Sequence, residues 1–215
     1  MGAKTWMLVY ADSNARQALG AKPRLDRAAT LALAQRLFPD ERLDALEDGD
    51  LSWTSPPDQE LHIGCFPGVS VVAAREFGID NPSRLAEHFI AAGSRGTIAL
   101  HAMHSVVNWF AYALWVDGRL TRSLSLSPDS GIIEDIGTRQ PFELPYWAGE
   151  RSACDSEEEA EAEPFPFDPL DLGEEALRAL FGYQLEGLVD GALLDPASIP
   201  LLRFRRRRRR WWPRR

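Results

Sequence analysis

"NWFAYALWVDGRLTRSLSLS" (residues 108–127) is the stretch that decides the fold. The dipeptide Asp117-Gly118 separates two runs, and such a pair between alternating runs is among the strongest signals of a β-hairpin. The second run alternates with period 2, as a half-buried strand does. We therefore predict a hairpin with a two-residue turn, whose aromatic side chains are buried on both faces. The pairs that this turn predicts are Trp115–Leu120, Ala111–Leu124 and Trp109–Leu126 on one face, and Tyr112–Ser123 and Phe110–Ser125 on the other.

Two histidines, His101 and His104, precede this hairpin in "HAMHSVVNWFAYALW" (101–115). In a helix, both would share one face with Asn108 and Tyr112 and form a ligand stripe. In a strand, residues three apart point to opposite faces, so the two histidines could not share a metal without a bulge. The hairpin favours the strand, with His101 inside a third strand and His104 in the connection. We expect structural, hydrogen-bonded histidines, and we keep metal binding or catalysis as the alternative.

Three carboxylates follow the hairpin, at Asp129, Glu134 and Asp135. Together with a nearby histidine they could hold a divalent cation. A run of this kind in an acidic protein is more often a solvated surface. The sequence has no DxDxDG loop, HExxH pair, phosphate-binding glycine loop or GxSxG elbow. We therefore expect no cofactor, and a metal-dependent hydrolase that uses these residues with the two histidines remains the alternative function.

The composition is that of a soluble globular protein, with 45% apolar and 26% charged residues in a chain of 215. No apolar run reaches the roughly 20 residues that a membrane-spanning helix needs, and the N-terminus does not resemble a signal peptide. The only two cysteines, Cys65 and Cys154, do not suggest a disulfide framework. We expect a cytoplasmic protein with two free thiols.

The remaining periodicity predicts an α+β fold, a mostly antiparallel sheet of about six or seven strands covered by two or three helices. Residues 12–24 read as a loop. Beyond the central hairpin, the predicted strands are 4–11, a hairpin within 42–53 about Asp48-Gly49, and two strands within 60–77 broken at Pro67-Gly68. The predicted helices are 26–38, 81–93 with Ser83 as cap and Gly93 as stop, and 172–187.

Charge divides the chain unevenly. The last thirteen residues, "RFRRRRRRWWPRR", carry nine arginines, which leaves 15 basic against 32 acidic residues in positions 1–202. So acidic a body is not typical of a duplex-DNA binder and suits a basic protein partner. The predicted organisation is an α+β core domain (1–150), an acidic disordered linker (151–168), a C-terminal helix and extension packed on the core (169–202), and a disordered Arg/Trp tail (203–215).

The tail has three possible explanations. Its codons can all be GC-rich, which would fit a frameshifted or read-through end. It could be an anchor for anionic lipid or nucleic acid, or it could fold onto the acidic body. Whatever its origin, we expect it to bind polyanions independently of the folded body. The residues expected to do so are Arg205, Arg206, Arg207, Arg208, Arg209, Arg210, Trp211 and Trp212.

Several distinctive words occur in order along the chain: "MGAKTWMLVYAD", "GCFPG", "LHAMHSVVNWFAYALWVDG", "RSLSLSPDSGIIEDIG", "PFELPYWAG" and "LGEEALRALFGYQLEG". They resemble an uncharacterised family of actinobacterial proteins, a domain of unknown function, over about residues 1–202. That resemblance implies no activity. The pattern "DGRL…IGTRQPFE" is also similar to bacterial α/β domains of the immunity-protein type, which bind a partner protein. We expect a non-enzymatic protein-binding or regulatory domain.

Overall fold

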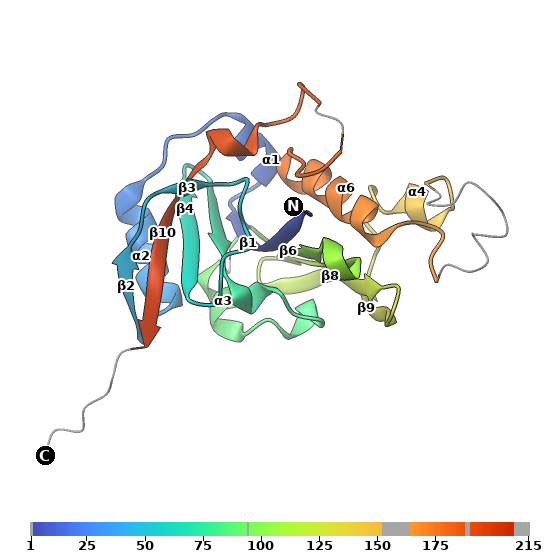
Figure 1. Ribbon diagram of the computed structural model, residues 1–215, viewed down its shortest axis with the longest axis horizontal. Helices are drawn as coiled ribbons and strands as arrows, with labels where there is room; N and C mark the ends of the chain where they lie inside the picture. Colours follow the sequence, from blue (N-terminus) through green and yellow to red (C-terminus); the bar gives the residue numbers. More distant parts are fainter. Residues whose placement is uncertain (1, 94, 152–163, 188–189, 209–215) are drawn as a thin grey trace, which may run out of the picture.

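The computed structural model describes residues 2–93, 95–151, 164–187 and 190–208, and its centre is one antiparallel sheet (Figure 1). The sheet has ten strands in the order β2-β10-β4-β5-β1-β6-β7-β8-β9, with β3 also paired to β10. The predicted α+β class with a mostly antiparallel sheet is confirmed. The predicted six or seven strands were too few.

The strands are β1 Lys4–Ala11, β2 Glu41–Ala45, β3 Gly49–Asp50, β4 Glu60–Phe66, β5 Val69–Ala73, β6 Thr97–His104, β7 Trp109–Val116, β8 Arg119–Ser127, β9 Gly131–Gly137 and β10 Pro200–Arg208. The α-helices are α1 Ala15–Gly20, α2 Arg27–Leu37, α3 Glu87–Ala92, α4 Leu144–Trp147 and α6 Pro169–Phe181. Short 3-10 helices are η1 Arg75–Phe77, η2 Pro82–Arg84, η3 Ser105–Val107 and η4 Pro196–Ser198.

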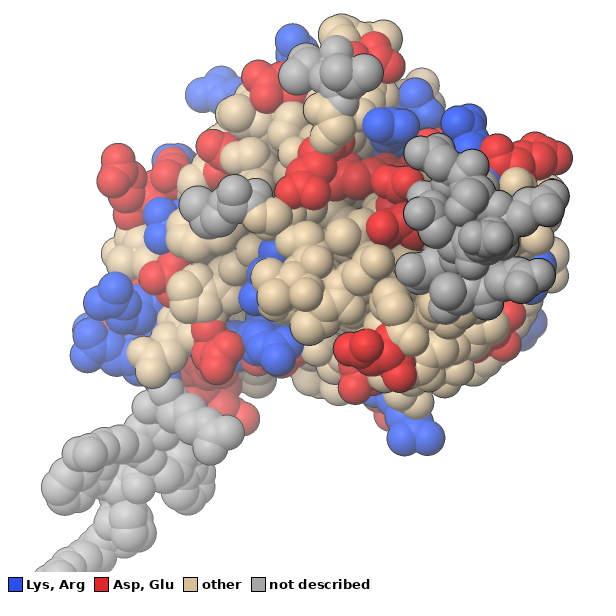
Figure 2. Space-filling view, turned by 45° about the vertical axis from the view of Figure 1, so that its right-hand side comes forward, with Lys and Arg blue, Asp and Glu red and all other residues tan. Residues whose placement is uncertain are grey.

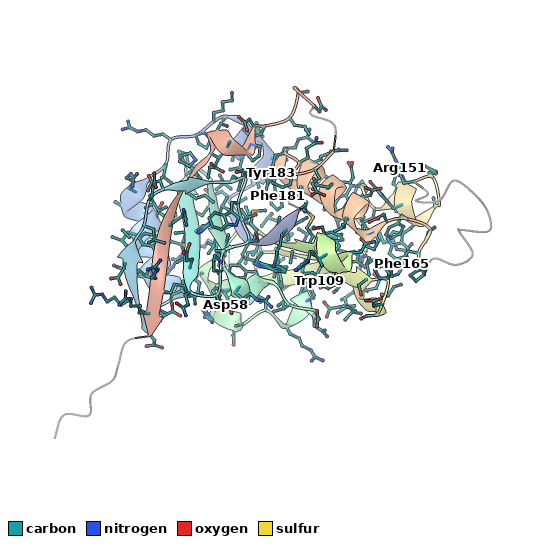
Figure 3. The ribbon with its side chains drawn as sticks, viewed as in Figure 1. Asp58, Trp109, Arg151, Phe165, Phe181 and Tyr183 are labelled. Carbon is teal, nitrogen blue, oxygen red and sulfur yellow. The ribbon has the colours of Figure 1, made fainter. Side chains whose placement is uncertain are left out.

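Each face of the sheet carries its own hydrophobic core. The α6 face is covered by α1, α4 and α6, and the α2 face by α2, α3 and the turns η1 and η2. Side chains alternate along a strand, so Phe110 and Tyr112 of β7 point to the α6 face and Trp109 and Trp115 to the α2 face. In Figure 3, Trp109 lies on the opposite side of the central strands from Phe181, at the end of α6.

The predicted hairpin is confirmed as β7 and β8, but most of its predicted register is wrong. Trp115 pairs with Leu120 as expected, whereas the next pair is Leu114 with Arg122. Thr121 is therefore an extra residue, a β-bulge, whose hydroxyl donates to the carbonyl oxygen of Leu114 at 3.1 Å. Every later pair shifts by one. The observed pairs are Ala113–Ser123, Tyr112–Leu124, Ala111–Ser125 and Phe110–Leu126.

The bulge decides which face each side chain reaches. Leu124 and Leu126 join the α6-face core, and Ser125 between them points to the α2 face, where Trp109 lies. Trp109 Nε1 donates to Ser125 Oγ at 3.2 Å, which satisfies two buried polar groups at once. Both faces of the hairpin thus combine apolar packing with buried polar groups, since Arg122 of β8 is fully buried on the α6 face.

The C-terminal strand β10 corrects two further predictions. Residues 42–53 do not form a hairpin, since β2 and β3 each pair with β10 instead. The disordered tail was expected to start at residue 203, yet residues 203–208 continue β10 and pair with both β2 and β4. The explanation that the tail folds onto the acidic body therefore holds for 203–208. Residues 209–215 lie outside the described residues.

The helices differ from prediction mainly at their ends. The predicted loop 12–24 contains α1, capped by Asn14, and the predicted 26–38 is α2, capped by Asp26. The predicted helix 81–93 is split into η2 and α3 by Leu85 and Ala86, whose ψ of 134° is extended. Ser83 lies inside η2 and binds a carboxylate of β9 instead of capping a helix. The predicted helix 172–187 corresponds to α6, which starts earlier, at Pro169, and ends at Phe181. Gly182 follows it in the left-handed region, with φ of 81°.

The linker prediction is tested only in part. Residues 152–163, with Cys154, lie outside the described residues. After them, Phe165 and Phe167 are buried in the α6-face core, so the packed chain resumes before residue 168, where the linker was predicted to end. Cys65 is buried and forms no disulfide.

Candidate functional site

His101 is a structural residue of strand β6. It is fully buried on the α6 face, where Nδ1 lies 2.7 Å from Thr5 Oγ1 and Nε2 lies 3.0 Å from the carbonyl oxygen of Gly173 in α6. Burial lowers the pKa of His101 to about 4, against the opposing effect of hydrogen bonds with the backbone of Gly173 and of His101 itself. The ring is therefore neutral at pH 7 and ties helix α6 to the sheet. The expectation of a hydrogen-bonded histidine within a strand is met here.

Asp135 belongs to a buried ion-pair network on the same face. It accepts a hydrogen bond from Arg122, whose guanidinium also donates two hydrogen bonds to Glu143, at 2.9 Å from Nε and 2.6 Å from Nη2. Arg122 and Glu143 are both fully buried, and the Tyr112 hydroxyl donates to Glu143 as well. Buried charges need such pairing. The network therefore anchors the segment that carries α4 to strands β7 and β8.

Glu134 faces the other way, towards the α2 face. Its carboxylate accepts hydrogen bonds from the Ser83 backbone N–H at 3.0 Å and from the hydroxyls of Ser83 and Ser123. Glu134 thus holds η2 against the sheet. Because adjacent residues of a strand point to opposite faces, Glu134 and Asp135 lie on opposite faces of β9. Neither carboxylate lies in a cavity with His101.

His104 and Asp129 are the predicted site residues that the structure does bring together. Both line a cavity of about 300 Å³ on the α2 face, which we call the tryptophan pocket. Its full lining is Trp6, Arg75, Gly78, Asp80, His104, Val107, Trp109, Ser127, Asp129, Ser130 and Ile133. The walls come from β1, η1, the end of β6, η3 and the turn between β8 and β9.

The floor of the tryptophan pocket is an aromatic cluster. The ring of Trp6 lies 5.9 Å from those of both Trp109 and His104, centroid to centroid. Both tryptophans are almost buried, with 5% and 7% of their surface exposed. Gly78 lies so close to Trp6 that a Cβ there would come within 2.6 Å of the indole. The pocket is therefore closed on this side by backbone.

The electrostatics of the pocket are mixed. Lys4 Nζ and the guanidinium carbon of Arg75 lie 4.9 and 5.0 Å from the centre of the Trp6 ring, within cation–π range. Burial and these two cations hold the pKa of His104 below its usual value, so it is neutral at pH 7. Asp80 and Asp129 are exposed, and within the described part of the chain neither forms an ion pair.

An exposed apolar rim borders the pocket. Val106 is 83% exposed and Val107 is 50% exposed, both in the turn η3. Asn108 follows them in the left-handed region, with φ of 46°, which is uncommon for a residue other than glycine. Asn108 Nδ2 donates to Asp168 Oδ2 at 3.4 Å, and this contact helps to fix the turn. The rim is thus held in place with its valines facing outwards.

The five candidate metal ligands do not converge. Two of them share the pocket, while His101, Glu134 and Asp135 are committed elsewhere. No group of three or more His, Cys, Asp or Glu side chains among the described residues is arranged to hold a metal ion. Sequence reasoning missed Trp6 and Arg75, which reach the pocket from the first strand and from a turn. The only signal for Trp6 was the aromatic content of "KTWMLVYA", and Arg75 had none.

The predicted polyanion-binding arginines are split by the strand β10. Arg206 is directed towards the α2 face and pairs with Glu41 and Glu76, and only 8% of its side chain is exposed. Arg205 and Arg207 are exposed. Nothing is described of the side chain of Arg208 or of residues Arg209, Arg210, Trp211 and Trp212.

A family of unknown function (DUF6928) matches residues 5–204, from the first strand into β10. The chain belongs to this family. No curated protein and no solved structure matches it. In the part of the chain that the structure describes, no helix is long and apolar enough to cross a membrane.

Proposed function

We propose that this protein is a binding protein of the cytoplasm rather than an enzyme, and that the tryptophan pocket with its valine rim receives a side chain of a basic protein partner. The observation that carries the proposal is the contrast between the outward-facing valines of η3 and the two nearly buried tryptophans beside them. Fixed apolar rims next to a small aromatic cavity are typical of protein-binding hot spots.

The composition of the pocket fits an interface better than a reaction centre. Tryptophan and arginine are enriched at the centres of protein interfaces. His104 is neutral, and its Nδ1 accepts a hydrogen bond from the Val106 backbone N–H at 3.3 Å, so one of its two nitrogens is committed to the turn. Only Asp129 among the other predicted ligands accompanies it. The hydrolase alternative therefore rests on two side chains.

The charge around the pocket favours a basic partner. Lys4 and Arg75 already lie against Trp6, and Arg75 is 3.6 Å from Asp58. Asp80 and Asp129 border the same cavity, and neither has an ion-pair partner among the described residues. A lysine or arginine of the partner would reach these carboxylates while its neighbours cover the valines. The net charge of −8 would speed that encounter.

The test compares a variant of the rim with a control variant at an exposed valine elsewhere. Val106→Asp/Val107→Asp puts charge on the rim, and Val116→Asp, at the far end of β7, changes a valine that is 45% exposed. Tagged wild-type and variant proteins would be used to capture partners from the native host, with quantitative mass spectrometry. We expect one basic protein to be retained by wild type and by Val116→Asp and lost from the rim variant.

Binding by the purified partner would then be measured by calorimetry with Asp80→Asn/Asp129→Asn. Affinity should fall at least 5-fold, and the association rate should lose salt dependence. If the rim variant keeps every protein that wild type retains, the pocket is not a docking site. A stoichiometric zinc or manganese ion that is lost in His104→Ala would instead favour the hydrolase.

A further inference from the structure

Strand β10 sorts its arginines between two faces. Arg206 lies over the Phe38 ring, 4.4 Å from its centre, on the α2 face with the buried Leu202 and Phe204. The alternate residues Arg203, Arg205 and Arg207 therefore lie on the opposite face, because side chains alternate along a strand. Leu201, one step earlier in this alternation, is buried in the α6-face core.

These alternate arginines form a line that starts at Trp53. The guanidinium of Arg203 lies 4.8 Å from the centre of the Trp53 ring, and Trp53 is 42% exposed. At the other end of the line, Arg207 pairs in register with Arg42 of β2, and their side chains are 66% and 74% exposed. We call Trp53, Arg203, Arg205, Arg207 and Arg42 the arginine stripe.

The stripe has an excess of positive charge. Its carboxylate partners are Glu60, 3.0 Å from Arg203, and Asp44, which lies 2.8 Å from Arg42 and 3.2 Å from Arg207. Four arginines thus meet two carboxylates, and Arg205 has no ion-pair partner in the part of the chain that is described. Figure 2 shows Lys and Arg side chains gathered at the left of the molecule.

We propose that the arginine stripe binds single-stranded nucleic acid, with phosphates along Arg205, Arg207 and Arg42 and a base against Trp53. Alternate residues of a strand are about 6.6 Å apart, a spacing that suits successive phosphates of an extended strand. An exposed indole next to a line of cations is the combination that single-strand binders use. The site lies on the opposite face of the sheet from the tryptophan pocket and does not depend on it.

The test measures binding of the full chain to a fluorescein-labelled oligouridylate of 12 nucleotides by anisotropy, at salt concentrations from 50 to 200 mM. The variant Arg205→Gln/Arg207→Gln is compared with Arg24→Gln/Arg119→Gln, which removes two exposed arginines elsewhere. We expect the stripe variant to bind at least 10-fold more weakly. Its slope of log affinity against log salt should fall by about 1.4, since each lost phosphate contact on a single strand contributes about 0.7. The control pair should bind like wild type.

The indole is tested separately from the charge. Trp53→Leu should weaken binding about 5-fold or more and Trp53→Phe should restore most of it, because stacking needs an aromatic ring. Circular dichroism would check that both variants are folded.

Three outcomes would overturn the proposal. The control pair could weaken binding as much as the stripe variant does, which would make the effect one of net charge. Trp53→Leu could leave affinity unchanged. Phosphatidylserine vesicles could bind with the same dependence on Arg205, Arg207 and Trp53 while the oligonucleotide does not, which would make the stripe a membrane site. Val106→Asp/Val107→Asp should leave oligonucleotide binding intact, so the two proposals can fail separately.

Discussion

The hairpin β7–β8 and the strand β10 are both parts of one sheet, yet their partners lie at very different distances along the chain. In the hairpin, Trp109 and Ser125 meet across 16 residues. In β10, Arg203 meets Glu60 across 143 residues and Arg206 meets Glu41 across 165. A turn dipeptide in the sequence can predict the first kind of contact. No local sequence pattern predicts the second kind of contact, so an arginine run that resembles a free tail can be an interior strand of the sheet.

The largest expected effect comes from cutting β10. Ending the chain after Leu202 removes all of the pairing with β2 and three of the four residue pairs with β4, and exposes the surface covered by Phe204, which is now buried. We expect a loss of at least about 4 kcal/mol, or roughly 10 °C or more in Tm, measured by calorimetry. A disordered tail that begins at residue 203, as expected from the sequence, would instead leave the Tm unchanged after this cut.

Ending the chain after Arg208 is the matched control, because it leaves every residue of β10. Its Tm should stay within about 2 °C of the full chain. If the cut after Leu202 melts like the full chain, β10 does not contribute to the stable sheet, and the arginines are a tail after all.

The next largest effect tests the hairpin. Trp109→Ala should cost about 3–5 kcal/mol, because the indole is nearly buried against Trp6 and its N–H satisfies Ser125. Urea denaturation measures the change. Trp53→Ala, at a partly exposed indole, should cost less than half as much. A Trp109→Ala protein as stable as wild type would show that the hairpin is wrongly assigned.

The sequence predicted the hairpin but not its bulge, and the reason is physical. "RSLSLS" alternates Leu and Ser, so either register satisfies the pattern, and the choice depends on how Thr121 and Arg122 are accommodated. The Arg122 guanidinium reaches Glu143 in a distant segment, and only the folded chain shows that contact. A hydrophobic pattern does not contain this information.

The candidate site was predictable to a similar degree. The stretch 101–115 contains His104, Val107 and Trp109, three residues of the pocket lining. Trp6 enters from elsewhere because β1 lies beside β6, and Arg75 because η1 contacts both strands. In the tail, a run of identical arginines has no hydrophobic period. The sequence therefore does not indicate which of them point to each face of the sheet. Which arginines are buried is decided by Phe38, Glu41 and Glu76 on the facing elements.

The smallest expected effect is the difference in stability between variants of two neighbouring arginines of β10. Arg206→Gln leaves Glu41 and Glu76 close together without their cation and should cost about 2–3 kcal/mol at pH 7. That is less than the roughly 3–5 kcal/mol for breaking a fully buried pair, since the side chains of these carboxylates are 20% and 36% exposed. Arg205→Gln, at an exposed position, should change stability by no more than about 0.5 kcal/mol. Urea denaturation of both variants checks the contrast.

The pH dependence of that difference sharpens the assignment. Burial raises the pKa of Glu76, but the hydrogen bonds and charge of Arg206 outweigh it and hold the pKa below the usual 4.5. The unfolded chain therefore binds a proton on Glu76 more readily than the folded chain does, so the stabilisation is complete above about pH 4.5 and is lost as the pH falls through the folded value. The gap between wild type and Arg206→Gln should be full at pH 7 and clearly smaller at pH 4. A gap that stays constant, or an equal loss in Arg205→Gln, would mean that Arg206 contributes packing on Phe38 and no ion pair. In that case charge would not distinguish the two faces of β10.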